Sequence, residues 1–491
     1  MTAPMREFEL KLEIPAARLK AVQQDVARLK GSTQVLRAVY YDTPAHDLQK
    51  HGLALRVREE SGEWVQTLKG DSGRALERLE YEVALGHRGA QPPLPAIEAY
   101  VGSDIARRLH KALGPSNADP MWAPLFATEV RRTTKLLREG DSQVEIAFDR
   151  GRIVAGDEEI AVREIEFELT EGAPSGAVAL ARRWLAKHHL WLGAISKFDK
   201  GLRLANGIDQ GPPVTAHTPV FDDAASVDAV ARASLTVCLD QVLRNAGELA
   251  ATHPTQGHIH QLRIGIRRTR TALRHLFERH ADASIEPALV HAFRVLGQRR
   301  DVEHVVQQLD PVIRAAGGPA LDAFEARSPM SASAVVRAPA FQDALLQLVQ
   351  LAHQEDGGGM KDVKDFLAKE LGKLREQALK DGRDFERLDP ERQHRVRKRL
   401  KRLRYLAEFA APLFASRKAG AFIDELKPAQ DALGLYNDEM TALAWYREQA
   451  DTQPRAWFAV GWLAARRERQ AEACAGVLRE LAKATPFWKD D

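Results

Sequence analysis

Residues 6–14 read REFELKLEI, and this stretch decides how the first part of the chain folds. From residue 7 onward, charged residues at odd positions alternate with apolar residues at even positions. A period of two is typical of a strand with one apolar face. The other face carries Glu7, Glu9 and Lys11, which either meet solvent or bind something. The rest of the chain bears on that choice.

The chain has 491 residues, which is enough for more than one domain and more than one core. Its formal net charge of +3 indicates no partner by itself, so the distribution of charge along the chain is more informative. No apolar run is long enough to span a bilayer, and the start of the chain lacks a hydrophobic signal core. We therefore expect a cytoplasmic protein without a membrane partner.

The two cysteines, Cys238 and Cys474, lie far apart and have no metal-ligand spacing. We interpret them as core thiols in a reducing compartment.

Alternating stretches recur through the first part of the chain, and several are bounded by Gly or Asp. They cover residues 7–14, 53–60, 64–70, 78–85, 144–156 and 162–172. Residues 15–30 and 174–190 instead have helical spacing, each with a proline near its start. This pattern predicts an α+β domain over 1–205, with an antiparallel sheet that closes or nearly closes.

A second domain follows a break in periodicity. Residues 206–222 are rich in Gly and Pro and predict a linker. Residues 223–491 have apolar spacing of the helical kind almost to the end, which predicts an all-α domain.

The helical part contains a repeat. HIHQLRIGIRRTRTALRHL (258–276) aligns without a gap with RQHRVRKRLKRLRYLAEF (392–409). An internal duplication predicts two similar helical bundles, over about 223–355 and 356–491, related by a pseudo-twofold axis.

On a helix, each copy of the repeat places a histidine and several cations along one stripe, beside an apolar stripe. The first row is His260, Arg263, Arg267, Arg270 and Arg274, and the second is His394, Arg397, Lys401 and Arg404. A single such row is usually a solvated face. Like charges one helical turn apart repel, however, so two copies of the row favour a bound linear polyanion.

Nucleic acid, phosphoinositide and polyphosphate all qualify as that polyanion. Apart from Tyr405, no aromatic residue is interleaved with the cations for base stacking, which favours the recognition of bare phosphate groups. Neither histidine has a second ligand at metal-binding spacing, so we do not expect a metal there.

The charged faces of the predicted strands combine acids with bases. The acids are Glu7, Glu9, Glu80, Glu82, Glu145, Asp149, Glu164, Glu166 and Glu168. The bases are Lys11, Arg56, Arg58, Lys69, Arg78 and either Arg131 or Arg132, between which the alternation does not choose. Rows of acids repel unless cations lie nearby, and their hard oxygens suit Mg²⁺ or Mn²⁺. The pattern favours a metal–phosphate site inside a closed sheet over a solvent face of mixed charge.

EFELK (7–11) resembles the E-x-E-x-K opening of the CYTH family, the triphosphate tunnel metalloenzymes. Further motifs follow in that family's order: YYDTP (40–44), GLALRVR (52–58), the strands of Glu80, Asp149 and Glu164, and SKFDKG (196–201). The resemblance covers residues 1 to about 205. The helical half resembles the CHAD domain, a helical module that binds inorganic polyphosphate. The whole chain is similar to the bacterial CYTH–CHAD inorganic triphosphatases.

This resemblance implies an eight-stranded antiparallel tunnel whose acids bind a divalent metal, Mg²⁺ or Mn²⁺, and whose bases bind triphosphate. The metal ligands it implies are Glu7, Glu9, Asp149, Glu164 and Glu166, with Glu168, Glu80 and Glu82 as further candidates. The catalytic phosphate-binding residues it implies are Lys11, Arg56, Arg58, Lys69, Arg132 and Lys197. EIEFE (164–168) has three acids where the motif needs two, so which pair binds metal stays open.

The function predicted is a metal-dependent inorganic triphosphatase that splits tripolyphosphate into pyrophosphate and phosphate. Its helical domain would bind long-chain polyphosphate and target the enzyme to it, including to polyphosphate granules. One alternative is a non-catalytic polyphosphate-binding or granule-associated protein. Another is a hydrolase or cyclase of an organic triphosphate such as thiamine triphosphate or ATP. We expect no nucleic-acid partner, and the sequence does not indicate the oligomeric state.

Overall fold

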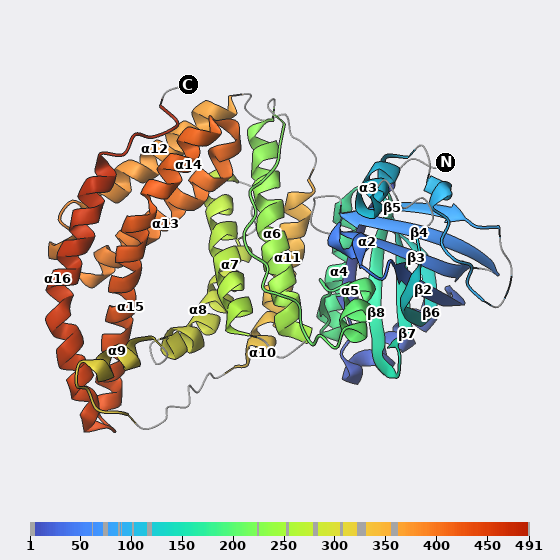
Figure 1. The fold of residues 1–491 in the computed structure, drawn as a ribbon, viewed down its shortest axis with the longest axis horizontal. Coiled ribbons are helices and arrows are strands. Elements are labelled where there is room, and N and C mark those ends of the chain that lie inside the picture. The colour runs from blue at the N-terminus through green and yellow to red at the C-terminus, as the bar shows by residue number, and fades with distance from the viewer. Residues whose placement is uncertain are drawn as a thin grey trace. The chain divides into compact units, whose positions relative to one another are not determined.

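The computed structural model describes residues 5–60, 62–71, 77–86, 89, 91–100, 103–114, 120–222, 225–251, 255–277, 283–304, 308–321, 330–354 and 362–489. The chain divides into two compact units (Figure 1). The first comprises residues 1–214, 242–258 and 336–354, and the second comprises 215–241, 259–335 and 355–491. Each unit therefore contains residues from three separate segments of the chain.

An antiparallel sheet of nine strands forms the body of the first unit. The strands are β1 (Met5–Glu13), β2 (Ser32–Asp42), β3 (Leu53–Glu60), β4 (Glu63–Asp71), β5 (Glu77–Ala84), β6 (Ala123–Glu139), β7 (Ser142–Ala155), β8 (Glu158–Glu171) and β9 (Trp191–Leu192). Their order in the sheet is β5-β4-β3-β2-β6-β7-β8-β1-β9.

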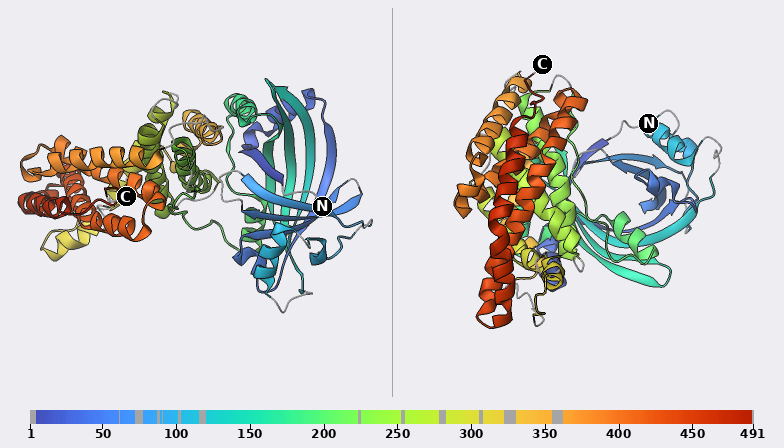
Figure 2. Two further views of the ribbon diagram at one scale, coloured as in Figure 1. Left: turned by 90° about the horizontal axis from the view of Figure 1, so that it is seen from above. Right: turned by 60° about the vertical axis from the view of Figure 1, so that its left-hand side comes forward.

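Strand β1 pairs both with β8, its neighbour in this order, and with β5 at the far end. Its residues 5–8 pair with β5, and its residues 9–13 pair with β8. The strands therefore curl into a ring (Figure 2). The ring is not closed over its full height, because no described residue of β1 pairs with β5 and β8 at once. The predicted antiparallel α+β fold is confirmed, with nine strands in place of eight because the short β9 adds to β1.

The alternation read from the sequence separates two faces of this sheet. We call the face that carries Glu9, Asp149 and Glu164 the inner face, and the opposite one the outer face. On β1, Leu10 and Leu12 of the outer face are fully buried. The apolar side is thus the one covered by other elements, and the charged side lines the inside of the ring.

Five helices of the first unit are α1 (Leu19–Arg28), α2 (Asp47–Lys50), α3 (Asp104–Leu113), α4 (Pro174–His188) and α11 (Pro339–Ala352). Helices α2 and α3 bury an apolar cluster with β3 and β4 that includes Leu55 and Leu68. Helix α4 packs on β1 and β8, where Trp184 meets Phe167. Helix α11 packs on α4 although it lies far along the chain.

Helix α5 (Lys197–Ala205) packs against the inner face instead. Its Phe198 and Leu202 join Phe126, Val130 and other inner-face residues in an apolar cluster. The close approach depends on Gly201, because a methyl group there would overlap the ring of Phe126. One end of the inner face is therefore apolar, and the charged residues lie beyond it.

All the regular elements among the described residues of the second unit are helices. Its helices are part of α6 (Val227–Ala251), α7 (Gln256–Leu276), α8 (Ile285–His304), α9 (Asp310–Ala315), α10 (Ala332–Val336), α12 (Val363–Gly382), α13 (Pro390–Ala410), α14 (Ser416–Glu425), α15 (Lys427–Ala450) and α16 (Trp457–Ala482). The prediction of an all-α domain is confirmed, and the two copies of the repeat form α7 and α13. The pseudo-twofold relation stays a prediction.

Both cysteines are buried as free thiols, as predicted, with Cys238 on α6 and Cys474 on α16. Among the described residues, no helix combines the length and the apolar character that crossing a bilayer requires. Residues 206–222 contain no helix or strand but do make fixed contacts. The backbone of Val214, for example, exchanges two hydrogen bonds with the Asn245 side chain of α6.

Candidate metal and phosphate site

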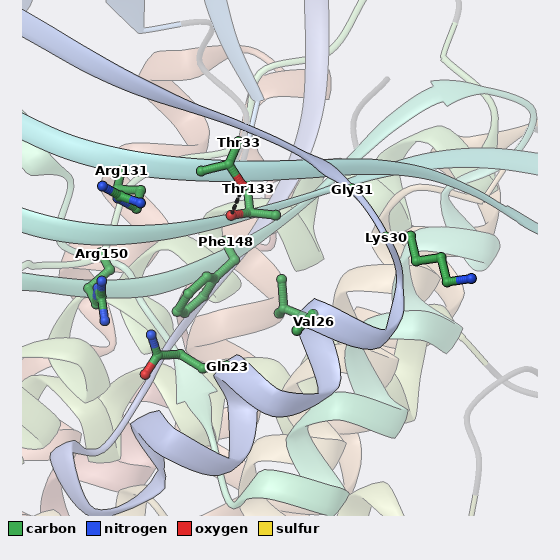
Figure 3. A pocket seen from close by; sticks show the side chains of 10 residues that line it. Gln23, Val26, Lys30, Gly31, Thr33, Arg131, Thr133, Phe148 and Arg150 are labelled. Carbon is green, nitrogen blue, oxygen red and sulfur yellow. Dashed lines mark hydrogen bonds between the residues drawn. The ribbon is translucent and has the colours of Figure 1, made fainter.

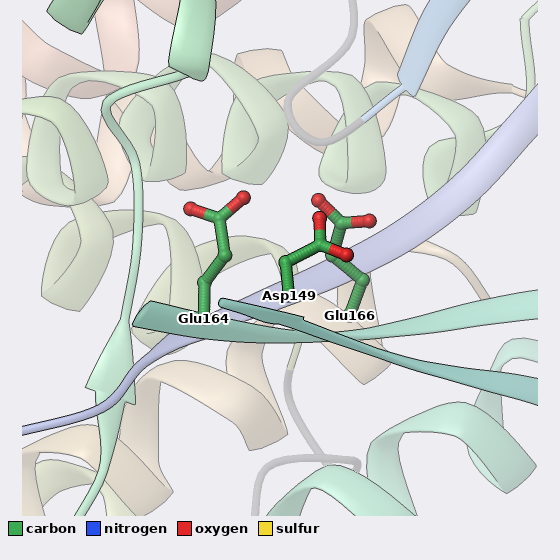
Figure 4. A group of neighbouring side chains, drawn as sticks. All are labelled: Asp149, Glu164 and Glu166. Atoms are coloured by element: carbon green, nitrogen blue, oxygen red, sulfur yellow. The ribbon is translucent and has the colours of Figure 1, made fainter. Parts of the chain in front are cut away.

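Three carboxylates meet on the inner face of β7 and β8. Asp149 of β7 lies directly across from Glu164 of β8, and Glu166 follows two residues later on the same face. One oxygen atom from each carboxylate lies within 4.8 Å of the others, and all three residues are buried (Figure 4). We call Asp149, Glu164 and Glu166 the acid triad. Strand register alone is sufficient to bring these side chains together.

Two cations neutralise the acid triad. Arg132 of β6 holds both oxygens of Asp149 with its Nε and Nη2, each at 2.7 Å, and pairs with Glu166. Lys197, the first residue of α5, places its Nζ 2.7 Å from Asp149 and 2.8 Å from Glu166, and it also pairs with Glu164. Burial alone would raise the pKa of Glu166, but Arg132 and Lys197 hold it well below its ordinary value. Glu166 is therefore ionised at neutral pH.

The start of α5 is fixed by a capping box. The Ser196 hydroxyl accepts from the Asp199 N–H at 3.0 Å, and the Asp199 carboxylate accepts from the Ser196 N–H at 3.2 Å. Lys200, one turn after Lys197, lies 2.5 Å from Glu13 and 3.6 Å from Glu164. Sequence reasoning missed Lys200, although its spacing of three from Lys197 puts both on one helix face.

Strand β1 adds Lys11 and Glu9 to the same region. The Nζ of Lys11 lies 3.8 Å from Glu164 and donates to the carbonyl of Ile195. Burial and the neighbouring Glu166 raise the pKa of Glu9 to about 7, and nearby cations oppose this rise. Glu7 follows on the same strand face, but its side chain lies outside the described residues.

Strands β3, β4 and β5 carry a second charged cluster. We call Arg56, Arg58 and Lys69 the basic wall. The Nη2 of Arg56 lies 3.4 Å from Glu80, the Nζ of Lys69 lies 2.5 Å from Glu80, and the Nη2 of Arg58 lies 3.5 Å from Glu82. Arg56 and Arg58 both lie near Glu82, at 3.7 and 3.5 Å, and burial and the adjacent Arg56 lower the pKa of Arg58.

The basic wall faces the acid triad across the ring. Lys69 of the wall lowers the pKa of Glu9, and Arg132 of the opposite side lowers the pKa of Arg58. Such mutual effects indicate proximity, because the interaction between two charges weakens with the distance between them. The inner face thus combines a buried acidic centre with cations on more than one side.

The acid triad fits a hard divalent cation. Carboxylate oxygens are the ligands that Mg²⁺ and Mn²⁺ prefer, and the triad presents one from each of three residues within 4.8 Å. Neither oxygen of Glu164 has a hydrogen-bond partner among the described residues, although lysine ammonium groups lie within ion-pairing distance. A cation would satisfy both oxygens.

The structure separates residues between which the sequence could not choose. Arg132 points to the inner face, whereas Arg131 lines a pocket on the outer face. Of the three acids of EIEFE, Glu164 and Glu166 join the acid triad. Glu168 lies further along, where burial and its register partner Glu145 raise its pKa.

In the second unit, cations of the two predicted rows lie close together. We call Arg263 and Arg267 of α7 with Arg397 and Lys401 of α13 the basic cluster. Burial, Arg267 and Arg397 lower the pKa of Lys401 to about 6. The guanidinium groups of Arg263 and Arg267 also lie over the ring of Phe293, at 4.7 and 5.6 Å from its centroid. The crowding favours an anion at this place.

Other members of the rows have acidic partners, so the rows are less free of acids than the sequence indicates. Arg270 and Arg274 both bond to Glu286 of α8, at 2.7 and 3.1 Å. Arg404 donates to Glu408 at 2.7 Å and to Gln430 at 2.8 Å. Glu286 lies outside the repeated motifs, whereas Glu408 lies within the second motif, at the position aligned with Arg274.

The histidines lie at the heads of the rows. His260 is half-buried on α7, and His394 is exposed on α13. Partial desolvation of its ring by surrounding atoms and the neighbouring Lys398 lower the pKa of His394. Lys398 and Arg402 were not predicted as site residues, yet both lie near Arg270 and feel its charge.

Comparisons with known proteins match the two parts of the chain separately. Residues 5–201 match the CYTH domain, and residues 233–447 match the CHAD domain. Over 207 residues the chain is 30% identical to the inorganic triphosphatase of Haemophilus influenzae, which covers 41% of this chain and 56% of that protein. The chain thus spans only about half the length of this curated relative.

Two solved structures show more distant likeness. The CHAD domain of the plant Ricinus communis is 22% identical, with a TM-score of 0.46, over 56% of this chain and 98% of that one. A Hippeastrum protein whose structure revealed a dominant triphosphatase activity is 20% identical, with a TM-score of 0.31, over 42% of this chain and 97% of that one. Neither likeness is close enough to bear on function. The domain matches establish that this chain contains a CYTH domain followed by a CHAD domain.

Proposed function

We propose that the first unit is a metal-dependent inorganic triphosphatase that splits tripolyphosphate into pyrophosphate and phosphate. One observation carries the proposal: a buried acid triad and a basic wall face each other on the inner face of one sheet. Acids alone would indicate a cation site and bases alone an anion site, whereas the combination suits a metal–phosphate substrate. The match to an inorganic triphosphatase supports this choice of substrate.

In this proposal the acids hold the metal and the bases bind the phosphate groups. Asp149, Glu164 and Glu166 would hold the divalent cation, Mg²⁺ or Mn²⁺, with Glu9 beside them. When bound, this cation would neutralise charge on the phosphoryl oxygens. Glu7 stays a predicted ligand.

The cations of the chain bind and orient the substrate. Arg56 and Arg58 offer guanidinium forks that match phosphate oxygens, and Lys69 and Lys11 add point charges. Arg132 and Lys197 keep the acids ionised and are long enough to reach a phosphate beside them. Cations fixed before the substrate arrives stabilise the charge that develops on the leaving pyrophosphate.

Phosphate release tests this function directly. With Mg²⁺ or Mn²⁺ present, we expect release from tripolyphosphate by the wild type and a loss of about 10²–10³-fold in kcat/KM for Glu166→Gln and for Arg58→Ala. Glu159→Gln is the matched control, because Glu159 is an exposed acid of the same strand, β8. Undiminished activity of the first two variants would refute the site.

Running ATP and thiamine triphosphate beside tripolyphosphate separates the substrates. Faster hydrolysis of either organic triphosphate would refute the inorganic assignment while leaving the site intact. No hydrolysis of any of them would favour a protein that only binds polyphosphate.

For the second unit we propose binding of long-chain inorganic polyphosphate at the basic cluster, which would keep the enzyme near polyphosphate. The gathering of four cations from two helices, which lowers the pKa of Lys401, supports this proposal. We expect salt-sensitive binding of long-chain polyphosphate that is weakened by Arg267→Glu with Lys401→Glu. Arg395→Glu is the control, since Arg395 is an exposed cation of the same helix. Equal weakening by the control would count against the cluster.

A further inference from the structure

A pocket on the outer face of the first unit shares no lining residue with the acid triad, the basic wall or the basic cluster. Its volume is about 280 Å³. Gln23 and Val26 of α1 form one side, and Arg131 of β6 with Phe148 and Arg150 of β7 form the other (Figure 3). In this view the guanidinium groups of Arg131 and Arg150 lie beside each other, with the Gln23 amide next to Arg150.

The arginines of this pocket belong to a ladder across three strands. Arg131 of β6 is the register partner of Arg150 of β7, and Arg150 is in turn the partner of Arg163 of β8. Directly opposed side chains have Cβ atoms about 5 Å apart, and like charges there are destabilising. None of the three forms an ion pair with an acid in the described part of the chain, and the Nε of Arg163 is buried without a hydrogen-bond partner.

The next position of β7 on the same face shows the opposite arrangement. Arg152 lies between Glu129 of β6 and Glu159 of β8, with its Nη2 3.0 Å from Glu129 and its Nη1 3.1 Å from Glu159. The protein therefore pairs an exposed arginine with two acids at one step of the strand. At the preceding step it places three arginines side by side with no such acid. A bound anion would supply the missing charge.

Helix α1 and the turn that follows it form the wall of the pocket opposite the strands, and this turn packs closely on the sheet. Lys30 ends the α1 region in the left-handed conformation, with φ of 52°. At Gly31, a Cβ atom would overlap the carbonyl oxygen of Thr134 on β6, so the turn lies tightly against the sheet. The hydroxyl groups of Thr33 and Thr133 then bond across the strands at 2.9 Å (Figure 3). A ligand would meet a largely preformed cavity.

We propose that Arg131, Arg150 and Gln23, above the ring of Phe148, form a binding site for a small phosphate-bearing anion on the outer face of the sheet. Two adjacent guanidinium forks match the oxygens of a phosphate group, and the amide adds a further donor. Phe148 is 5% exposed and, with Val26, gives the pocket an apolar floor that can contact a non-phosphate body. The pocket is open to solvent on one side, and its volume of about 280 Å³ has room for a phosphate group with a small organic body.

Arginine labelling of the intact wild-type chain tests the site without any substitution. Phenylglyoxal modifies accessible guanidinium groups, and the modified residues are located by peptide mass analysis. We expect orthophosphate, pyrophosphate or AMP to slow the labelling of Arg131 and Arg150 several-fold while leaving Arg152 unchanged. Equal slowing by orthophosphate and AMP would show that the phosphate group alone is bound. Stronger slowing by AMP would show that the apolar floor also contacts the ligand. Unchanged labelling of Arg131 and Arg150 with all three anions at millimolar concentration would overturn the proposal.

Amide exchange provides the second test, because anions also bind elsewhere on this chain if the proposed functions hold. The same anions should slow exchange over residues 19–35 in the wild type and in Arg152→Gln. In the double variant Arg131→Gln, Arg150→Gln this slowing should disappear. Slowing that persists in the double variant would show that it originates at another site and would refute the assignment.

Discussion

Arg131 and Arg132 show how one step along a strand changes the chemistry of a side chain. Arg132 holds Asp149 and Glu166 on the inner face, and Arg131 stands beside Arg150 on the outer face. Because β-strand side chains alternate, two adjacent arginines cannot serve the same site.

Replacing Arg132 with Gln should destabilise the protein strongly. The change leaves Asp149 and Glu166 buried without their main partner, which costs about 3–5 kcal/mol in the free energy of unfolding. Denaturation by urea measures this. Arg152→Gln removes a surface arginine whose ion pairs are solvent-exposed, so the same measurement should change far less. Equal effects of the two variants would contradict the buried network.

Lys401 should make stability depend on pH. Its pKa is about 6 when folded, below the ordinary value, so between that pH and about 10 the unfolded chain binds more protons. Lys401 therefore lowers the free energy of unfolding most near pH 6, and this penalty shrinks as the pH rises across that window. Lys401→Met removes the effect, so the variant's advantage over the wild type should be largest near pH 6 and shrink by pH 9. A difference that does not vary with pH would show that Lys401 is not crowded.

For single residues, the sequence predicted which charged side chains share a face of the sheet better than it predicted which side chains pair with each other. Alternation placed Glu9, Lys11 and Arg58 on one face because it depends only on neighbouring positions. It could not choose Arg132 over Arg131, since both are arginines. The choice depends on the pairing of β6 with β7, which sets Arg132 opposite Asp149. Lys200 was missed because its partner Glu13 is distant in the chain.

Helix α5 links the apolar end of the inner face to the acid triad. Its Leu202 packs among the apolar residues while its Lys197 reaches Asp149. A displacement of this helix should therefore change both stability and activity.

Gly201→Ala tests that link. A methyl group at residue 201 would overlap Phe126, and relief of the overlap should cost about 1–3 kcal/mol and withdraw Lys197. Denaturant unfolding and tripolyphosphate hydrolysis should both decline. Gly476→Ala on α16 is the matched control, because a Cβ there meets open space, and it should be neutral or stabilising by up to about 1 kcal/mol. A Gly201→Ala variant as stable and active as the control would show that α5 is not seated as described.

Elements with a strong period could be predicted, and those defined by distant contacts could not. The strand of REFELKLEI and the helices of the repeat are present as expected. The two-residue β9 carries too little pattern to detect. The neutralisation of Arg270 by Glu286 depends on how α8 packs, which the repeat itself does not encode.

The compact units do not follow the order of the chain. Residues 339–352 fall within the stretch that matches the CHAD domain, yet they form α11 of the first unit. There the buried Gln342 accepts from the Leu192 N–H at 2.8 Å and donates to the Val336 carbonyl at 2.6 Å. The order of residues along the chain cannot reveal that α11 packs in the first unit. It shows where one periodic pattern gives way to another, but not which segments pack together.

Gln342→Ala should therefore loosen the β-sheet unit. The variant leaves two buried backbone groups without partners, at a cost of about 1–3 kcal/mol, and should speed amide exchange around β9 and β1. Gln350→Ala on the same helix is the control, since the Gln350 side chain forms no hydrogen bond within the described part of the chain. Unchanged exchange at β9 in the Gln342 variant would contradict the placement of α11.

The central claim, that the inner face of the ring splits tripolyphosphate with the help of a divalent metal, is tested most directly by phosphorus NMR. With wild-type chain, tripolyphosphate and Mg²⁺ or Mn²⁺, pyrophosphate and orthophosphate should appear in equal amounts. Chelation with EDTA or the change Glu166→Gln should stop their appearance. Wild-type protein that leaves tripolyphosphate intact with either metal, or a Glu166→Gln variant that cleaves it at the wild-type rate, would refute a metal-dependent triphosphatase site on the inner face.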